Sequence, residues 1–366
     1  MASVKRRPDG KWRARYRSPD GREHARHFDR KVDAEQWLVS VEHRKLTGEY
    51  VDPNAGRVTV EAYGEQWRAI QVHRPSTVAQ VETNLRRHLY PVLGSRPIGA
   101  VRPSEVQAWV KGLSGDLAPS TVELVYRYAA SIFRAAVEDR VITASPCRGI
   151  KLPKQERRRV EPITVEQVHA LMAALPARYR ALVLLGAGSG LRQGEAFGLT
   201  VDRVDFLRGS VVVDRQLVLA PGGPPTFGPP KTAASVRTVP IPELVVKGLS
   251  AHLAEFGRGP DDLIFTNSEG GPIRRTRFSD VWRPAAKSAG LEAGTGFHAL
   301  RHFYASALIH HGESVKVVQD RLGHATAAET LDTYSHLWPD SEDRTRAAVA
   351  LALAPAADSS RTAQGS

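Results

Sequence analysis

The stretch HALRHFYASALIHHGESVKVVQDRLGHATAAETLDTY, residues 298–334, decides how this chain is interpreted. Its first turn carries two cationic side chains, His298 and Arg301, and residues three positions apart are neighbours on one face of a helix. Leu322-Gly-His324 is typical of a helix C-terminus, where glycine ends the helix and histidine stabilises that end. Tyr334 alone would be an ordinary half-buried aromatic residue. Taken singly, each feature has a plain structural explanation.

Two further motifs precede that stretch. Gly190-Leu-Arg-Gln-Gly-Glu195 alone would be a helix start with a surface ion pair, and Pro230-Lys-Thr232 follows a proline-rich loop. Cleaving a phosphodiester without a metal needs a nucleophile, donors that neutralise the non-bridging oxygens, and an acid for the leaving oxygen. Guanidiniums bind phosphate through two parallel hydrogen bonds and stay charged, a lysine can protonate, and a tyrosine hydroxyl can attack. One segment of the chain supplies all of these groups.

Motifs for metals and nucleotides are missing from the sequence. It has no His-Glu-x-x-His helix, no EF-hand loop and no Gly-x-x-x-x-Gly-Lys-Ser/Thr loop, and Cys147 is its only cysteine. The most metal-like pair, Asp261-Asp262, sits in a Gly-Pro-Asp-Asp-Leu turn. We therefore expect a phosphoryl transfer that uses no metal ion, no nucleotide and no other cofactor.

The order and spacing of the motifs resemble the tyrosine recombinase (phage integrase) family. Gly190 to Glu195 matches its first arginine box, and Pro230-Lys-Thr232 matches its β-hairpin lysine. His298-x-Leu-Arg-His302 with Leu322-Gly-His324 matches the second box, and Thr330-x-x-x-Tyr-Ser-His336 matches the nucleophile motif. Arg301 and His324 are 23 residues apart, and His324 and Tyr334 are 10 apart, as are the matching residues of the family. Any one motif is weak, but the ordered set is specific.

This resemblance implies a role for each residue of the set. Arg192, His298 and Arg301 would hold and neutralise the scissile phosphate. Lys231 would protonate the leaving 5′-hydroxyl, and His324 would support the phosphate and the transition state. No position that the family requires is missing.

The resemblance makes Tyr334 the nucleophile of a 3′-phosphotyrosyl intermediate, which the 5′-hydroxyl of the partner strand later attacks. The tyrosyl ester keeps the phosphate bond energy, so no ATP is needed. A free tyrosine has a pKa of about 10, so the cationic cluster must also assist its deprotonation. Glu195 is expected as a structural partner of the first box, and His302 as a supporting group that does not touch the reacting atoms.

Two of these assignments have rivals in the sequence. Lys231 lies beyond a long proline-rich loop, and Lys247 or Lys287 could be confused with it. Among nine tyrosines, Tyr304 is the nearest competitor for the nucleophile. It sits mid-helix beside Phe303, where packing is the plainer explanation.

Composition agrees with a DNA-binding protein. A net charge of +12 and a pI near 10.0 call for an anionic partner, either nucleic acid or an acidic membrane surface. No apolar run approaches the roughly 18 residues of a membrane span, and the N-terminus has no apolar signal core. We therefore expect a cytoplasmic protein that works on nucleic acid. Its 366 residues fit two or three domains.

Residues 1–57 form the first predicted domain, with a strongly basic start. Residues 1–31 hold eleven Lys/Arg against four Asp/Glu. Lys11, Arg13, Arg15 and Arg17 alternate with aromatic or small residues, which is the period of a strand. We predict a three-stranded sheet braced by one helix. The basic face of this sheet is either solvated or laid into a DNA groove. The whole predicted domain resembles the arm-site-binding domain of the larger integrases.

Residues 58–155 are predicted to be an all-α four-helix domain. Ser104-x-x-Gln107 and Ser120-x-x-Glu123 are expected capping boxes at two helix starts. Such a domain could be a scaffold or a DNA clamp, and it resembles the family's core-site-binding domain. Residues 160–347 are predicted to form a mainly α catalytic domain with a small antiparallel sheet, and residues 348–366 a disordered tail. The fold class is thus multidomain α+β.

The expected partners follow from the resemblance. They are double-stranded DNA at core and arm attachment sites, three further copies of the chain in a tetramer on a Holliday junction, an excision helper and a host DNA-bending protein, with no membrane. The helix from Arg344 to Leu353 could dock on a neighbouring protomer. Two rival classes stay open: a chromosome-dimer resolvase or topoisomerase with the same chemistry, and an inactive DNA-binding regulator.

Overall fold

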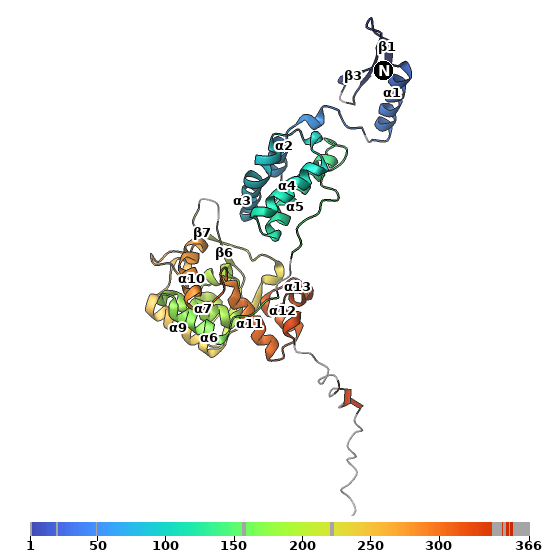
Figure 1. Cartoon of the computed structure of the whole chain (residues 1–366). Helices are drawn as coiled ribbons and strands as arrows, with labels where there is room; N and C mark the ends of the chain where they lie inside the picture. The colour runs from blue at the N-terminus through green and yellow to red at the C-terminus, as the bar shows by residue number, and fades with distance from the viewer. Residues whose placement is uncertain are drawn as a thin grey trace, which may run out of the picture. The chain divides into compact units, whose positions relative to one another are not determined.

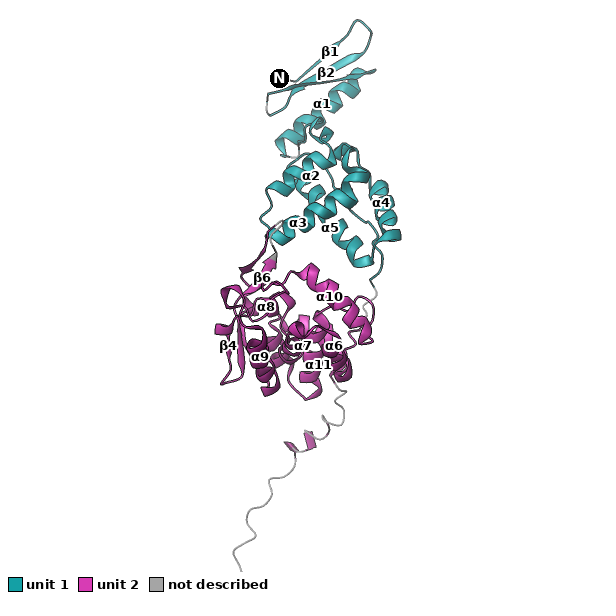
Figure 2. Ribbon diagram, turned by 90° about the vertical axis from the view of Figure 1, so that its left-hand side faces the viewer, with its two compact units in different colours: residues 1–156 teal, residues 157–366 magenta. Residues whose placement is uncertain are grey.

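The computed structural model describes residues 2–19, 21–48, 50–155, 159–219 and 223–338, together with residues 346, 349, 350, 352 and 353. The chain divides into two compact units, residues 1–156 and 157–366 (Figure 2). The expectations for the tail after residue 348 and for docking by the helix from residue 344 fall mostly outside the described residues. Within the described part, no helix combines the length and apolar character that crossing a bilayer requires.

The first unit begins with an antiparallel sheet in the order β1-β2-β3 (Figure 1). Its elements are β1 (Ser3–Arg6), β2 (Trp12–Arg17), β3 (Glu23–Phe28) and the helix α1 (Lys31–Leu46). Ala14 and Tyr16 of β2 are buried against Leu38 and Val41 of α1. Side chains alternate between the two faces of a strand, so the arginines of β2 lie on the face away from α1. The predicted sheet and helix are both present.

Four helical segments with their own core follow in the same unit (Figure 1). They are α2 (Val60–Ala69), α3 (Pro75–Asn84), which continues into a π-helical segment (Leu85–Gly94), α4 (Pro103–Asp116) and α5 (Pro119–Glu138). α5 is the centre of this core, because one face of it is buried through Ala129, Ile132 and Phe133. The apolar period of 3.6 residues that predicted this helix is therefore the period of its packing.

Two predicted helix starts in this unit are wrong. α4 and α5 begin one residue earlier than the expected serine caps, at Pro103 and Pro119. Proline suits the first helical position because that residue needs no backbone donor and its φ is already helical. At α4, Glu105 accepts the backbone N–H of Arg102 and closes the helix start.

The second unit is mainly helical with two small antiparallel sheets. The sheets have the orders β4-β5-β8 and β6-β7. The strands are β4 (Val204–Asp205), β5 (Ser210–Val213), β6 (Gln216–Leu219), β7 (Pro225–Gly228) and β8 (Arg237–Pro240). The helices are α6 (Val165–Ala174), α7 (Ala177–Ser189), α8 (Gln193–Phe197), α9 (Glu243–Phe256), α10 (Arg275–Ser288), α11 (His298–His310), α12 (Val315–Leu322) and α13 (Ala327–Tyr334). β7 lies where the sequence predicted only a proline-rich loop.

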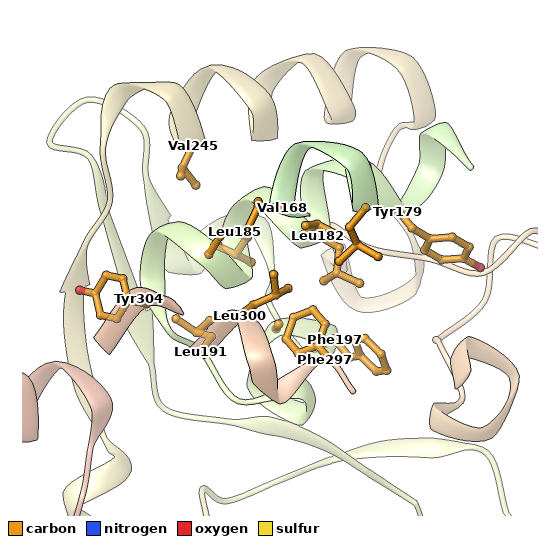
Figure 3. Packing of buried hydrophobic residues seen from close by; sticks show 14 of the residues in the cluster. Val168, Tyr179, Leu182, Leu185, Leu191, Phe197, Val245, Phe297, Leu300 and Tyr304 are labelled. Atoms are coloured by element: carbon orange, nitrogen blue, oxygen red, sulfur yellow. The ribbon is translucent and has the colours of Figure 1, made fainter. Parts of the chain in front are cut away.

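α7 is the central element of this unit. From Ala181 to Gly188 its residues are apolar all round, as expected of a helix surrounded by others, and it packs against α6, α9 and α11. Figure 3 shows Leu182 and Leu185 of α7 beside Leu300 of α11. The helix ends at Gly190, whose φ of +63° is a left-handed conformation that suits glycine. A Cβ there would overlap the ring of Tyr304, which is itself buried in the core.

Short 3-10 helices connect several of these elements. They span Ala55–Arg57, Ile98–Ala100, Val201–Arg203, Ala233–Ser235, Pro260–Asp262 and Ser335–Leu337. A capping box begins α6, because Thr164 and Gln167 bond each other's backbone N–H groups. The predicted glycine ending of α12 is confirmed, since Gly323 has a φ of +65°.

Candidate active site

Three arginine side chains are anchored on backbone carbonyls at the C-terminal ends of two helices. The last carbonyls of a helix have no partner within it and carry the negative end of its dipole. Arg301 donates through Nη1 to the carbonyl of Gly190, at the end of α7, over 2.8 Å. Its Nη2 donates to Leu322, the last residue of α12, over 2.6 Å. These two bonds tie α11 to the ends of α7 and α12.

The end of α12 accepts two more guanidiniums. Arg192 donates through Nη2 to the carbonyl of Gly323 over 3.0 Å, and Arg237 donates through Nε to Arg321 over 2.8 Å. Arg192 comes from the start of α8 and Arg237 from β8. A single helix end thus gathers arginines from three elements that are far apart in the sequence.

One buried carboxylate pairs two of these arginines. Glu195 is 2% exposed; its oxygens accept from Nη1 of Arg192 at 3.0 Å and from Nη2 of Arg237 at 2.9 Å. Burial alone would raise the pKa of Glu195, but the hydrogen bond and charge of Arg237 and the contacts with Arg192 outweigh it and lower the pKa. Arg301 bonds only backbone carbonyls, so the cluster holds three guanidiniums and one paired carboxylate. The cluster keeps a surplus of positive charge.

Arg301 experiences this surplus most strongly. Its side chain is 1% exposed, and its anchors are neutral carbonyls. Burial, followed by the charges of Arg192 and Arg237, lowers the pKa of Arg301 to about 9. The guanidinium stays charged at neutral pH, but its charge is poorly compensated. An anion bound beside it would relieve that cost.

Three histidines line the same cluster. His298 and His302, one turn apart on α11, meet edge to face with ring centroids 4.7 Å apart. Although His298 keeps an exposed edge, restricted solvation and the neighbouring cations lower its pKa to about 4. His324 is buried, and its Nδ1 bonds Thr330 Oγ1 at 2.8 Å. Burial and then the charge of Arg301 lower the pKa of His324, also to about 4. Both rings are neutral at pH 7.

Tyr334 ends α13 inside this cluster. Its side chain is 1% exposed, its ring stacks on that of His324 at a centroid distance of 6.5 Å, and its hydroxyl lies 2.8 Å from Nδ1 of His302. Burial raises the pKa of Tyr334 to about 12, although the charge of Arg301 pulls it down. The expectation that His302 stays away from the reacting atoms is wrong, because it contacts the hydroxyl of the expected nucleophile.

Lys231 lies at the edge of this arrangement. It is exposed and follows β7. The segment after it is anchored to the cluster, because Thr232 Oγ1 and Ser235 Oγ are 2.9 Å apart and Ser235 Oγ accepts from Arg192 at 3.1 Å. The structure thus brings together Arg192, His298, Arg301, His324 and Tyr334, and places Lys231 four residues before a contact of Arg192.

Sequence reasoning missed Arg237. It lies on β8 and pairs with Glu195 and the end of α12. The one signal for Arg237 was Glu195 in the first box. If that carboxylate is buried, the single part-exposed Arg192 cannot satisfy its charge, and a second cation is needed. Among the described residues, no group of three or more His, Cys, Asp or Glu side chains could hold a metal ion.

The predicted DNA-binding residues lie on the outer face of the first sheet. Lys11 precedes β2 and pairs with Asp29 at 3.7 Å. Arg13 and Arg15 reach Glu23 at 3.7 and 3.4 Å, and Arg17 is exposed. Antiparallel pairing sets Lys5 of β1 and His27 of β3 beside Arg13.

Comparisons with known proteins place the chain in a family. The phage integrase family model matches residues 161–340, the phage integrase central domain residues 58–152, and the phage integrase N-terminal domain residues 2–48. The integrase of Mycobacterium phage D29 is 29% identical over 349 residues, covering 88% of this chain and 90% of that protein. The chain belongs to the phage integrase family. It is a tyrosine site-specific recombinase of the kind that integrates or excises a mobile element.

Two solved structures share its fold. The integrase of transposon Tn1549, in complex with a circular intermediate DNA, aligns with a TM-score of 0.69 and 23% identity over 81% of this chain and 99% of that chain. A lambda integrase tetramer bound to a Holliday junction aligns with a TM-score of 0.60 and 18% identity over 89% and 96%. At these identities the likeness concerns the fold, which is the predicted multidomain α+β class.

Glu195→Gln should destabilise the DNA-free protein. The substitution leaves Arg192 and Arg237 without their shared carboxylate, and breaking a buried ion pair costs about 3–5 kcal/mol. Urea unfolding of the second unit measures the loss, and added sulfate should restore part of it. Glu292→Gln, at an exposed position, is the matched control. Equal stability of the Glu195 and Glu292 variants would refute the proposed pairing.

The free energy of unfolding of the DNA-free protein should decrease as the pH is lowered, because of His324. Its pKa of about 4 in the fold lies below its ordinary value of 6.5. The unfolded chain therefore binds this proton more readily, and acidification from pH ~6.5 towards 4 favours unfolding by up to about 1.4 kcal/mol per pH unit. His324→Asn should flatten the slope of unfolding free energy between pH 6.5 and 5, whereas exposed His311→Asn should not. His298, whose pKa is also about 4, should keep part of the slope in the His324 variant. A slope equal to that of wild type would contradict the assignment.

Proposed function

We propose that Tyr334 attacks a DNA phosphodiester that Arg192, His298 and Arg301 hold. The observation that carries this proposal is the position of the nucleophile: a buried phenol lies beside a cluster of three guanidiniums, of which two pair with one carboxylate and the third bonds only backbone carbonyls. A phosphodiester supplies the anion that the cluster lacks. Guanidiniums fixed in advance by helix ends then stabilise the charge that develops on the phosphorane without reorganising.

The reaction is an exchange of two esters. Tyr334 Oη forms a bond to phosphorus while the bond from phosphorus to the 5′-oxygen breaks, and Lys231 gives that oxygen a proton. The product is a 3′-phosphotyrosyl ester with a free 5′-hydroxyl, and His324 supports the phosphate throughout. A 5′-hydroxyl from the partner strand reverses the same step. Bond energy is conserved, so the exchange needs no ATP.

The three sequence domains divide the DNA contacts. Residues 58–155 and 160–347 would clamp the core site, and residues 1–57 would hold an arm site through Lys11, Arg13, Arg15 and Arg17. One chain that holds two sites gains effective concentration for the second contact. The DNA between them must bend, and duplex DNA resists bending over about 150 bp. A host DNA-bending protein and an excision helper would meet that cost.

Strand exchange between two duplexes needs four cleavages, so four protomers would assemble on a Holliday junction in the cytoplasm. A lambda integrase of the same fold is a tetramer on such a junction, which supports this assembly. A resolvase or topoisomerase would use the same chemistry. The match of residues 2–48 to the N-terminal domain of phage integrases favours the integrase. An inactive regulator would have no physical reason to keep this charge cluster around a tyrosine.

Tyr334→Phe should abolish covalent capture of DNA and keep DNA binding. The test uses a duplex from the region that flanks the protein's own gene, nicked near the core site so that the cleaved strand diffuses away. Wild type should give a covalent complex on a denaturing gel, with or without a chelator, and Tyr304→Phe should do so if it folds. Capture by the Tyr334 variant, or loss of capture in chelator, would contradict the mechanism.

Substitutions on the outer sheet face should weaken arm binding selectively. The double substitution Arg13→Gln with Arg17→Gln removes two cationic side chains. Each lost phosphate contact makes the negative slope of log affinity against log salt concentration shallower by about 0.9. Binding to the full flanking region should therefore weaken, while cleavage of a short core duplex should persist. Arg44→Gln, exposed on α1, is the control. An equal effect of the Arg44 variant would remove the arm-site assignment.

A further inference from the structure

The ring of His302 is in direct contact with the hydroxyl of Tyr334, although phosphate binding requires no such contact. The hydroxyl of Tyr334 lies 2.8 Å from Nδ1 of His302, and the two rings meet at 64° with centroids 5.6 Å apart. The residues are 32 positions apart, on α13 and α11. The nucleophile must lose its proton when it attacks phosphorus, and a base within hydrogen-bond reach of that proton is what general base catalysis requires.

We propose that Nδ1 of His302 accepts the phenolic proton of Tyr334 during cleavage and returns it during ligation. This inference rests on the proposed function of Tyr334 as the nucleophile. In cleavage, the proton moves from Oη to Nδ1 as the Oη–P bond forms, and the 5′-oxygen takes its own proton from Lys231. In ligation, the imidazolium of His302 protonates Oη as the ester breaks. No further reactant is needed.

The other groups around the hydroxyl are committed elsewhere. Arg301 is a cation whose Nη1 and Nη2 already donate to helix-end carbonyls. His324 stacks on the tyrosine ring instead of meeting its hydroxyl; its Nδ1 bonds Thr330, and its Nε2 faces Glu329 at 3.8 Å. His298, the remaining histidine, meets His302 edge to face. Nδ1 of His302 is the base in contact with the attacking oxygen.

Electrostatics would tie this proton transfer to the bound phosphate. Burial and the charge of Arg301 lower the pKa of His302, while the pKa of Tyr334 is raised to about 12. In the DNA-free protein the proton therefore stays on the phenol, because an imidazolium would add a charge to a cluster that is already cationic. A phosphorane gains a second negative charge in the transition state, which favours the imidazolium at the moment of attack.

His302→Asn separates a base from a mere positioning contact. The asparagine oxygen can occupy roughly the place of Nδ1 and accept a hydrogen bond, but it cannot take the proton. We expect the single-turnover rate of covalent complex formation on the nicked duplex to fall at least about 100-fold, with unchanged DNA binding and thermal unfolding. His310→Asn, exposed at the end of the same helix, should cleave like wild type. A wild-type rate in His302→Asn would overturn the proposal.

A duplex with sulfur in place of the bridging 5′-oxygen distinguishes the base from the acid. A thiol ionises near pH ~8.5, so its thiolate leaves without a proton donor. This substrate should restore cleavage by Lys231→Ala and leave His302→Asn slow. Restoration of the His302 variant would refute a base role. Failure of the wild type to form any covalent complex would instead refute the proposed function itself.

The pH profile of wild type tests the same role without a substitution that could affect folding. The groups that face the pair are His298 and Arg301 on α11, His324 after α12, and Glu329 on α13. Protonation of His302 should slow the cleavage step on the acidic side, and the sulfur substrate should keep that limb. A cleavage rate on the sulfur substrate that shows no acidic limb at any pH at which the protein stays folded would contradict a histidine base.

Discussion

The bonds from buried guanidiniums to the C-terminal carbonyls of α7 and α12 are the constraint on which the site depends. These carbonyls are unpaired because the helices stop there, and the helices stop there because Gly190 and Gly323 adopt left-handed conformations. Neutral acceptors fix the arginines without cancelling their charge. The single carboxylate of Glu195 leaves a positive surplus. The fold therefore builds a site that is completed by an anion.

Burial, and not that surplus, sets the protonation state of the nucleophile in the DNA-free protein. A phenol beside cations would be expected to ionise easily, yet burial raises the pKa of Tyr334 to about 12 against the opposing charge of Arg301. Loss of hydration outweighs that charge because the side chain is only 1% exposed. In the proposed mechanism, the phosphate neutralises the positive charge of the cluster and makes proton loss from the phenol favourable. Tyr334 therefore becomes reactive only when DNA is bound.

Sequence patterns predicted those parts of the molecule that local rules govern. Period-2 alternation predicted β2, the 3.6-residue period predicted α5, and Gly323 predicted the end of α12. Prolines at positions 103 and 119 displaced two expected serine caps, since a helix start with proline needs no cap at the next residue. β7 was missed because a proline-rich run gives no strand period. Arg237 and the contact of His302 with Tyr334 could not be predicted, because they join elements 32 to 84 residues apart through side-chain geometry alone.

In the proposed mechanism, a positively charged pocket lets the hydroxyl of one particular tyrosine replace a sugar oxygen at phosphorus. Peptide mapping of the trapped covalent complex by mass spectrometry identifies that residue. We expect the nucleotide to remain on the peptide containing Tyr334, joined through its 3′-phosphate. A nucleotide on Tyr304 or on a serine, or a linkage through a 5′-phosphate, would contradict it.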